Sequence, residues 1–296
     1  MTIVPHGRLF SFCGILLTSL LPPLAPAATH VVVYGVDGLS SKGIEQARTP
    51  VIHELMKAGS WTLHARSVIP TVSSPNWAAM IMGAAPDFTG VTSNEWQPDK
   101  YDITPFCDDG SRHAPTIFGL IQKGRPNAST ALFTDWPDFP RLIEPTAASK
   151  VFVKDNDASE VVDQAVRYIT SGRPALTFIH VDHVDHAGHT SGWQTPEYLQ
   201  AVEFADVLLG RTLKALDEAG LRAETVVLVT ADHGGHDKKH GAMIQSDIEI
   251  PWIASGPGVP KDHEIHNPVS TTQTAPTIAR WLGITPSDCW LAHAVE

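Results

Sequence analysis

Carboxylate and imidazole side chains follow three short apolar segments of this sequence, at the point where each segment ends. These two ligand types together suit Zn²⁺, Mn²⁺ or a related divalent cation. A lone Asp in such a place is usually a turn or cap residue, whereas three coincidences indicate one shared site. The residues are Asp37 after 30–36, Asp185 and His189 after 175–181, and Asp232 with His233 after 225–231.

The spacing of these residues favours a centre that holds two cations. Asp185 and His189 are four residues apart, so a single helical turn would bring both onto one face. Asp232 and His233 are adjacent at the end of a predicted strand, where a bend lets both side chains reach inward. Without cations these acids would repel one another, and two bound cations would turn that repulsion into attraction.

Two adjacent serines, Ser73 and Ser74, precede a Pro-Asn-Trp run that has the character of a helix start. Pro75 fits the first helical position, which makes Ser74 the predicted N-cap and Ser73 the residue before it. Unpaired backbone N–H groups at such a place attract phosphate. Taken alone, the stretch is read as a capped helix. Beside two cations, an exposed hydroxyl here becomes a candidate nucleophile.

The elements that must position these residues belong to the α/β class. Apolar runs alternate with amphipathic segments, a pattern typical of a mainly parallel central sheet sandwiched by helices. Ligands bind such sheets beyond the carboxyl ends of their strands, so the candidate residues should meet at one edge. A long excursion at 86–115 is rich in Asp, Pro and Gly, and excursions of that length are usually functional. Strands are predicted at 30–36, 175–181, 225–231 and 250–256, and helices from the Thr195 cap to Gly220 and near the C-terminus.

Residues 1–27 are predicted to be an export signal, with Arg8 before an apolar stretch at 10–21 and a small-residue cleavage site at 25–27. The stretch is too short to span a bilayer comfortably, and no later segment approaches the ~20 apolar residues that a spanning helix needs. We therefore expect no stable membrane insertion after cleavage, and a periplasmic or extracellular location. Residues 28–296 are predicted to form a single domain.

Charge and cysteine content narrow the classes of partner. Without residues 1–27 the formal charge is 20 − 32 = −12, because Arg8 is the only charge lost from 21 basic and 32 acidic residues. An acidic surface argues against a nucleic-acid polymer as partner. Cys107 and Cys289 remain outside residues 1–27. In an oxidising compartment they could form a disulfide, and the sequence favours neither the disulfide nor two free thiols.

The motifs together resemble the alkaline phosphatase superfamily, most closely a short form of its nucleotide pyrophosphatase and type I phosphodiesterase branch. Each motif is moderately specific, and their order over nearly all of 28–296 is strongly so. The matching stretches are VDG at 36–38, TPVIHELMKAGSW at 49–61, PTVSSPNWAAMIMG at 70–83, GVTSNEW at 90–96, DHAGH at 185–189, ADHGG at 231–235 and IPWIASGPGV at 250–259.

The resemblance implies a role for each matching residue. Ser73 aligns with the nucleophile, although related phosphodiesterases usually carry Thr followed by Phe at this point. Asn76, which follows the S-x-P pattern, is implied to contact a phosphoryl oxygen. One cation would be held by Asp37, Ser73, Asp232 and His233, and the other by Asp185, His189 and a later His. His240 stands where shorter relatives place that last ligand, and His236 is its main competitor.

The implied activity is that of an exported two-metal phosphoric ester hydrolase acting on small-molecule phosphate esters through a phosphoseryl intermediate. Zn is the metal that the family favours, with Mn or Mg as alternatives. A phosphodiesterase or nucleotide pyrophosphatase is favoured because no Arg or Lys lies between Arg66 and Lys100, around Ser73. An alkaline phosphomonoesterase and a phosphotransferase are the alternatives.

Two further readings concern tryptophans near the candidate nucleophile. A sulfatase requires a C/S-x-P-x-R pattern, and Trp77 stands where that Arg belongs, so this activity is disfavoured. Trp77 and Trp96 could stack on a base or an aromatic leaving group, and for Trp77 a packing role in the core is equally open.

Overall fold

The computed structural model describes residue 1, residues 28–108 and residues 110–296. The predicted export signal at 1–27 therefore lies outside the described residues, apart from Met1. Over the described part of the chain, no helix combines the length and the apolar character that crossing a membrane requires.

A central sheet confirms the predicted α/β class. Its eight described strands lie in the order β4-β3-β5-β1-β6-β7-β2-β8. Every neighbouring pair is parallel except the two that involve β7, which runs antiparallel to both β6 and β2. The strands are β1 (His30–Val36), β2 (Ser60–Arg66), β3 (Thr130–Thr134), β4 (Lys150–Val153), β5 (Leu176–Val181), β6 (Thr225–Thr230), β7 (Glu249–Ser255) and β8 (His263–Glu264).

The four strands predicted from apolar runs match β1, β5, β6 and β7 to within one residue at each end. Every residue of β1, β5 and β6 is buried. Interior parallel strands are covered on both faces, which explains why they read as continuous runs of Val, Ile and Leu rather than as an alternating pattern.

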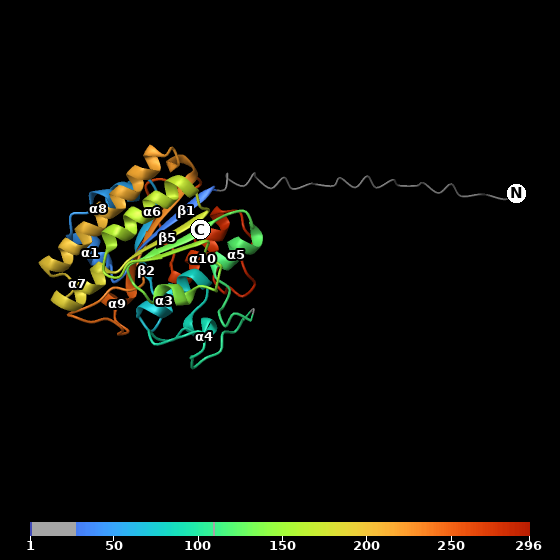
Figure 1. Ribbon diagram of the computed structural model, residues 1–296, viewed down its shortest axis with the longest axis horizontal. Helices are drawn as coiled ribbons and strands as arrows, with labels where there is room; N and C mark the ends of the chain where they lie inside the picture. The colour runs from blue at the N-terminus through green and yellow to red at the C-terminus, as the bar shows by residue number, and fades with distance from the viewer. Residues whose placement is uncertain (2–27, 109) are drawn as a thin grey trace.

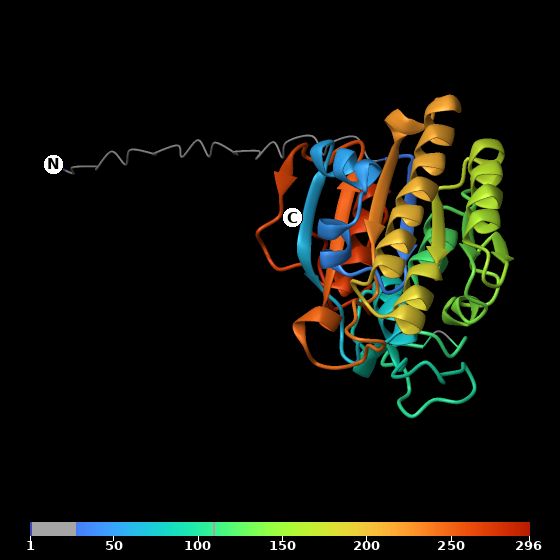
Figure 2. The ribbon, with the colours of Figure 1, turned by 90° about the vertical axis from the view of Figure 1, so that its left-hand side faces the viewer.

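Helices cover both faces of this sheet (Figure 1). On one side α8 packs against α1, α2, α6 and α7, and on the other α3 packs against α5 and α10. Figure 2 shows α9 and the 86–115 excursion together at the lower end of the molecule. The helices are α1 (Ser41–Gln46), α2 (Pro50–Lys57), α3 (Ser73–Met82), α4 (Pro86–Thr89), α5 (Ile117–Gly124), α6 (Ala158–Gly172), α7 (His183–Ser191), α8 (Pro196–Glu218), α9 (Gln245–Ile248) and α10 (Thr274–Trp281), with short 3-10 turns η1 (Phe139–Leu142), η2 (Arg222–Glu224) and η3 (Thr271–Gln273).

Helix α8 has the ends that its sequence predicts. The Thr195 side chain accepts a hydrogen bond from the backbone N–H of Tyr198, and Pro196 occupies the first helical position. Two residues after the last helical residue, Gly220 adopts a left-handed conformation with φ of 67°, which stops the helix.

Helix α3 begins two residues earlier than predicted, at Ser73 instead of Pro75. Ser73 is its first residue and Val72, in an extended conformation, is the N-cap without a side-chain bond, so the prediction that Ser74 caps the helix is wrong. Pro75 is the third helical residue, a position that tolerates proline because the N–H groups of a first turn have no intrahelical partner. A residue distant in the sequence supplies the side-chain cap, because Asn94 Oδ1 accepts from the Ser74 N–H at 2.8 Å.

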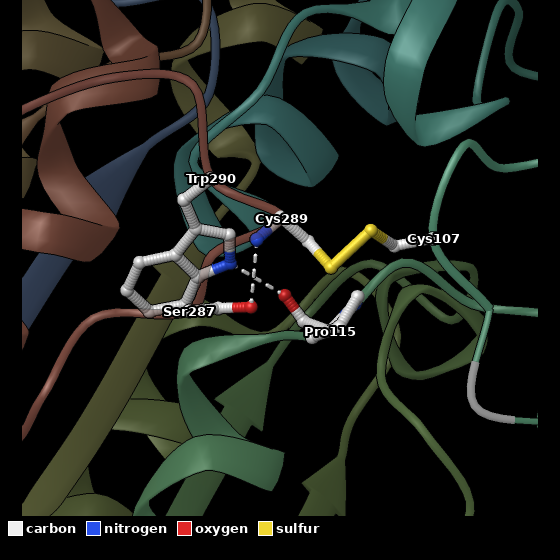
Figure 3. The surroundings of a disulfide bond; sticks show 5 residues. All are labelled: Cys107, Pro115, Ser287, Cys289 and Trp290. Carbon is white, nitrogen blue, oxygen red and sulfur yellow. Dashed lines mark hydrogen bonds between the residues drawn. A yellow bond between two sulfur atoms is a disulfide. The ribbon is translucent and has the colours of Figure 1, made fainter.

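The 86–115 excursion is tied to the C-terminal tail. Cys107 and Cys289 form a disulfide with their Cα atoms 6.0 Å apart, which decides the pairing that the sequence left open. Beside it, Trp290 Nε1 donates to the carbonyl of Pro115 at 2.7 Å (Figure 3). Because these contacts join segments far apart in the chain, they fix the excursion against the body of the protein.

Candidate metal centre and nucleophile

The first predicted ligand cluster is assembled at the carboxyl ends of β1 and β6. Ligand atoms of Asp37, Asp232 and His233 all lie within 4.8 Å of one another, and all three residues are buried. His233 Nε2 is 3.4 Å from Asp37 Oδ1 and 3.2 Å from Asp232 Oδ2. One oxygen of each carboxylate is held by the protein, through Trp77 Nε1 to Asp37 Oδ2 and through the Gly38 N–H to Asp232 Oδ1.

The second predicted cluster joins helix α7 to the loop that follows β6. Ligand atoms of Asp185, His189 and His240 lie within 4.8 Å of one another. Asp185 Oδ2 is 3.3 Å from His189 Nε2, and Asp185 Oδ1 is 3.8 Å from His240 Nε2. The competitor His236 instead donates from Nδ1 to Asp247 Oδ1 at 2.7 Å. The structure therefore brings His240, and not His236, to this cluster.

All three histidines of the clusters are oriented in the same way. Each places Nδ1 against a backbone carbonyl oxygen, so Nδ1 carries the ring proton and the lone pair of Nε2 faces the carboxylates. This is the arrangement by which an outer hydrogen bond fixes a metal-ligating imidazole. The carbonyl acceptors for His233, His189 and His240 are those of Gly234 at 2.8 Å, Lys238 at 3.0 Å and Thr71 at 2.9 Å, in that order.

Unpaired oxygens show that the two clusters fit divalent cations. Asp37 Oδ1, Asp185 Oδ1 and Asp232 Oδ2 are buried, and none has a hydrogen-bond partner among the described residues. A buried carboxylate oxygen without a partner costs free energy, and a cation removes that cost. Three such oxygens converge with three correctly oriented imidazoles, so the donor set matches Zn²⁺ or a similar ion.

The electrostatics of the clusters point the same way. Burial raises the pKa values of Asp185 and Asp232 well above the usual range, and neighbouring carboxylates, Asp37 foremost, raise them further. Burial also lowers the pKa of His233 to about 3, with a contribution from His240. Burial pushes the pKa of Asp37 upward too, but the hydrogen bond from His180 and the nearby imidazoles bring it below its usual range. A positive charge at the centre would favour the ionised carboxylates and the neutral imidazoles together.

The two adjacent serines have different surroundings. Ser73 Oγ lies 3.4 Å from His233 Nε2, so its hydroxyl adjoins the first cluster. Ser74 is fully buried, and its Oγ accepts from Arg141 NH2 at 2.9 Å. Only the first of the two hydroxyls is thus placed to react at the clusters.

Asn76 does not have the surroundings that the resemblance implied. It is fully buried, and its Oδ1 accepts from the Val68 N–H at 2.7 Å. Its Nδ2 donates to the carbonyls of Pro70 and Val72, each at 3.0 Å. This geometry contradicts the expected contact between Asn76 and a phosphoryl oxygen. Both polar ends of the amide are bonded to the backbone of the loop that leads to Ser73.

Asn94 is the functional candidate that the sequence reasoning missed. Its Oδ1 caps helix α3 at Ser74, which leaves the Nδ2 group at the start of the helix. Within 28–108 and 110–296, neither that amide group nor the Ser73 N–H has a hydrogen-bond acceptor. Two free donors beside the nucleophile form a candidate site for a phosphoryl oxygen. The only signal in the sequence was the position of Asn94 within the GVTSNEW motif.

Arg141, in η1, is a second residue that the sequence did not place near the nucleophile. Its NH2 group donates both to Ser74 Oγ and to the Asn94 carbonyl, the latter at 2.5 Å. Its NH1 group pairs with Asp138. The sequence has no basic residue close to Ser73, but the fold brings the Arg141 guanidinium near it. This guanidinium is bonded to protein groups and does not face an open site.

Neither tryptophan is placed to stack on a base or a leaving group, the role that the sequence left open for both. Trp77 is fully buried in the core, where Nε1 donates to Asp37, and this supports the packing alternative. Trp96 is 2% exposed and packs against the ring of His113. Neither ring surface is accessible to a base or a leaving group.

Residues 31–250 match the family described as type I phosphodiesterase / nucleotide pyrophosphatase. The chain belongs to this family. Its place in the alkaline phosphatase superfamily, predicted from the motifs, is thereby confirmed, and its relatives are hydrolytic enzymes.

Type I phosphodiesterase relatives resemble the chain over most of its length. Ectonucleotide pyrophosphatase/phosphodiesterase family member 1 of Homo sapiens is 23% identical over 236 residues, which are 73% of this chain and 25% of that protein. A bis(5'-adenosyl)-triphosphatase of Pongo abelii is 22% identical over 247 residues, or 79% and 52% of the two chains. The chain thus spans about a quarter to a half of the length of these relatives.

A solved structure of the murine ectonucleotide pyrophosphatase/phosphodiesterase 5 shares the fold. It superimposes with a TM-score of 0.74 at 17% identity, covering 91% of this chain and 97% of that one. At this identity the likeness concerns the fold, and it confirms the alkaline phosphatase-like architecture predicted for the chain.

Proposed function

We propose that this protein is an exported phosphodiesterase that hydrolyses small phosphate esters of the nucleotide type through a phosphoseryl intermediate at Ser73. The observation that carries the proposal is the position of Ser73 Oγ, 3.4 Å from His233 Nε2 at the start of α3, beside two clusters of unpaired ligand atoms. We further propose that each cluster holds one divalent cation, with zinc favoured over manganese or magnesium.

The chain's own residues divide the work as follows. Two bound divalent cations would neutralise charge on the phosphoryl group and favour the ionised form of the Ser73 hydroxyl. Ser73 Oγ attacks phosphorus in line, and the bond from phosphorus to the leaving oxygen breaks as the new one forms. The Ser73 N–H and Asn94 Nδ2 donate to a non-bridging oxygen during this step. Water then attacks the phosphoserine, which releases the phosphate product and restores Ser73.

A diester is the preferred class of substrate. A dianionic monoester usually calls for a free basic side chain at the phosphate, whereas Arg141 uses its NH2 and NH1 groups on Ser74, Asn94 and Asp138. The donors left at the helix start are uncharged amides, which suit the single negative charge of a diester. The murine structural relative is described in complex with AMP, which supports a nucleotide as one part of the substrate.

Export is supported by the disulfide and by the relatives. A disulfide such as Cys107–Cys289 persists mainly in an oxidising compartment. The matching human protein is named an ectonucleotide enzyme, and another relative of Macrovipera lebetinus is a venom phosphodiesterase. Residues 28–296 would then be the mature chain, with all eight described strands in one sheet.

The substrate class is tested with an aryl phosphate diester and an aryl phosphate monoester that share one leaving group. We expect kcat/KM to favour the diester by at least about tenfold, equivalent to ~1.4 kcal/mol of transition-state free energy. The Ser73→Ala protein, purified in parallel, corrects for contaminating hydrolases. A preference for the monoester would make the protein a phosphomonoesterase. A protein that holds two metal ions and cleaves neither ester would refute the proposed activity.

A further inference from the structure

The segment 234–242, which we term the ligand loop, controls both histidines of the second cluster. It carries His240 itself, and its Lys238 carbonyl accepts the hydrogen bond from His189 Nδ1 at 3.0 Å. The Asp237 carbonyl of the loop accepts a hydrogen bond from the Trp193 N–H at 2.8 Å, which joins the loop to the segment after α7. A displacement of this loop would therefore move one imidazole and release the other.

The tip of the ligand loop is polar and lies at the surface. Asp237, Lys238 and Lys239 at its tip are exposed. The chain turns at Asp237 and Gly241, whose φ angles of 47° and 99° lie in the left-handed region. Polar contacts therefore hold the loop, both at this tip through the Asp237 and Lys238 carbonyls and near its two ends.

Asp247, a fully buried residue of α9, contacts the loop near its two ends at three points. Its backbone carbonyl accepts from the Gly234 N–H at 2.9 Å. Its carboxylate accepts from His236 Nδ1 at 2.7 Å through Oδ1, and from the Ala242 N–H at 2.9 Å through Oδ2. One buried side chain thus fastens the loop on both sides of His240.

The geometry points to Asp247 as a positioning residue for the second cation site, a role that rests on the proposed two-cation function. Asp247 belongs to neither predicted ligand cluster, so it acts through the loop and not by contact with the cation. The carboxylate accepts from these two N–H donors of the loop, and its Oδ1 also accepts from Ser246 Oγ at 3.3 Å. An amide in its place would turn its own N–H₂ group toward one of them, and that end of the loop would lose its hydrogen bond.

The Asp247→Asn protein tests this role through metal binding rather than activity. Zinc content is measured by mass spectrometry of the metal, and the two dissociation constants are measured by competition with a chelator. We expect one ion to keep its wild-type affinity and the other to bind 10- to 100-fold more weakly, the usual effect of losing an outer-shell partner. Gln245→Ala is the matched control, because Gln245 is exposed on the same short helix and, within the described part of the chain, its side chain donates hydrogen bonds to Glu249 alone.

A pair of His236 variants keeps the test informative if Asp247→Asn does not fold. His236→Leu removes the donor to Asp247 Oδ1 but no cluster ligand, and we expect a weakening of the second ion alone. His236→Asn retains an N–H donor near the position of Nδ1, and we expect it to restore most of the affinity. Equal affinities in the two variants would contradict the fastening role.

The outcomes separate this inference from the proposed function. A folded Asp247→Asn protein that binds both ions as the wild type does, or that loses both equally, overturns the positioning role. A wild-type protein that binds fewer than two ions overturns it as well. If the wild type binds two ions but hydrolyses no phosphate ester, the proposed function fails while the role of Asp247 stands.

Discussion

Replacing Ser73 with Ala is expected to abolish phosphate-ester hydrolysis, with kcat/KM lower by about 10⁴-fold or more. Its hydroxyl is the group that lies beside His233 at the start of α3, and no acceptor for the phosphoryl group would replace it. Metal content should be preserved, because Asp37, Asp232 and His233 still form the first cluster. Steady-state kinetics and metal analysis of the same preparation check both statements.

Ser74→Ala is the matched control for the nucleophile. It removes the contact with Arg141 but leaves the Ser73 hydroxyl in place. Loss of one hydrogen bond to a charged group is expected to reduce kcat/KM by no more than about a hundredfold. The assignment would be wrong if Ser74→Ala were inactive and Ser73→Ala retained wild-type turnover.

Removal of divalent cations is expected to have the second large effect, on activity and on stability together. Without cations, three buried carboxylate oxygens have no bonding partner, and the carboxylates of the two clusters repel one another. An ion present at a hundredfold excess over its Kd stabilises the folded state by about 2.7 kcal/mol, so the melting temperature should fall by several degrees. Calorimetry and ester hydrolysis, before and after chelation, measure the two effects.

Readdition and one variant make the cation experiment specific. Zn²⁺, Mn²⁺ and Mg²⁺ are added back separately, and we expect zinc to restore hydrolysis at the lowest free concentration. Asp185→Asn removes a ligand of the second cluster only, so chelation should shift its melting temperature about half as far as that of the wild type. Full hydrolysis by a chelated, metal-free protein would exclude a cation-dependent reaction.

Much of the fold could be predicted because its signals are local. Strands β1, β5 and β6 are covered on both faces and are therefore continuous apolar runs, and α8 begins with Thr195 and Pro196. The ligand clusters followed from one further rule, that the carboxyl ends of parallel strands share an edge. The choice of His240 over His236 came from the family resemblance and agrees with the observed cluster.

The remaining features depend on contacts between distant segments. Asn94 caps helix α3 at the Ser74 N–H, and Arg141 donates to Ser74 Oγ. Both residues are too far from Ser73 in the sequence to be predicted from the residues around it. Because Asn94 satisfies the Ser74 N–H, the helix can begin at Ser73 without a side-chain cap of its own. Asn76 was predicted to face the substrate, but a buried amide must satisfy its polar atoms, and the bend at 68–72 offers the partners.

The central claim is that the phosphoryl group passes through Ser73, and the stereochemistry at phosphorus tests it most directly. A phosphorothioate diester of single configuration is hydrolysed in ¹⁸O-labelled water, and the configuration of the product is determined. Two successive in-line displacements, one by Ser73 and one by water, each invert phosphorus, so the account predicts overall retention. Inversion would show a single direct attack by water and would contradict the phosphoseryl intermediate.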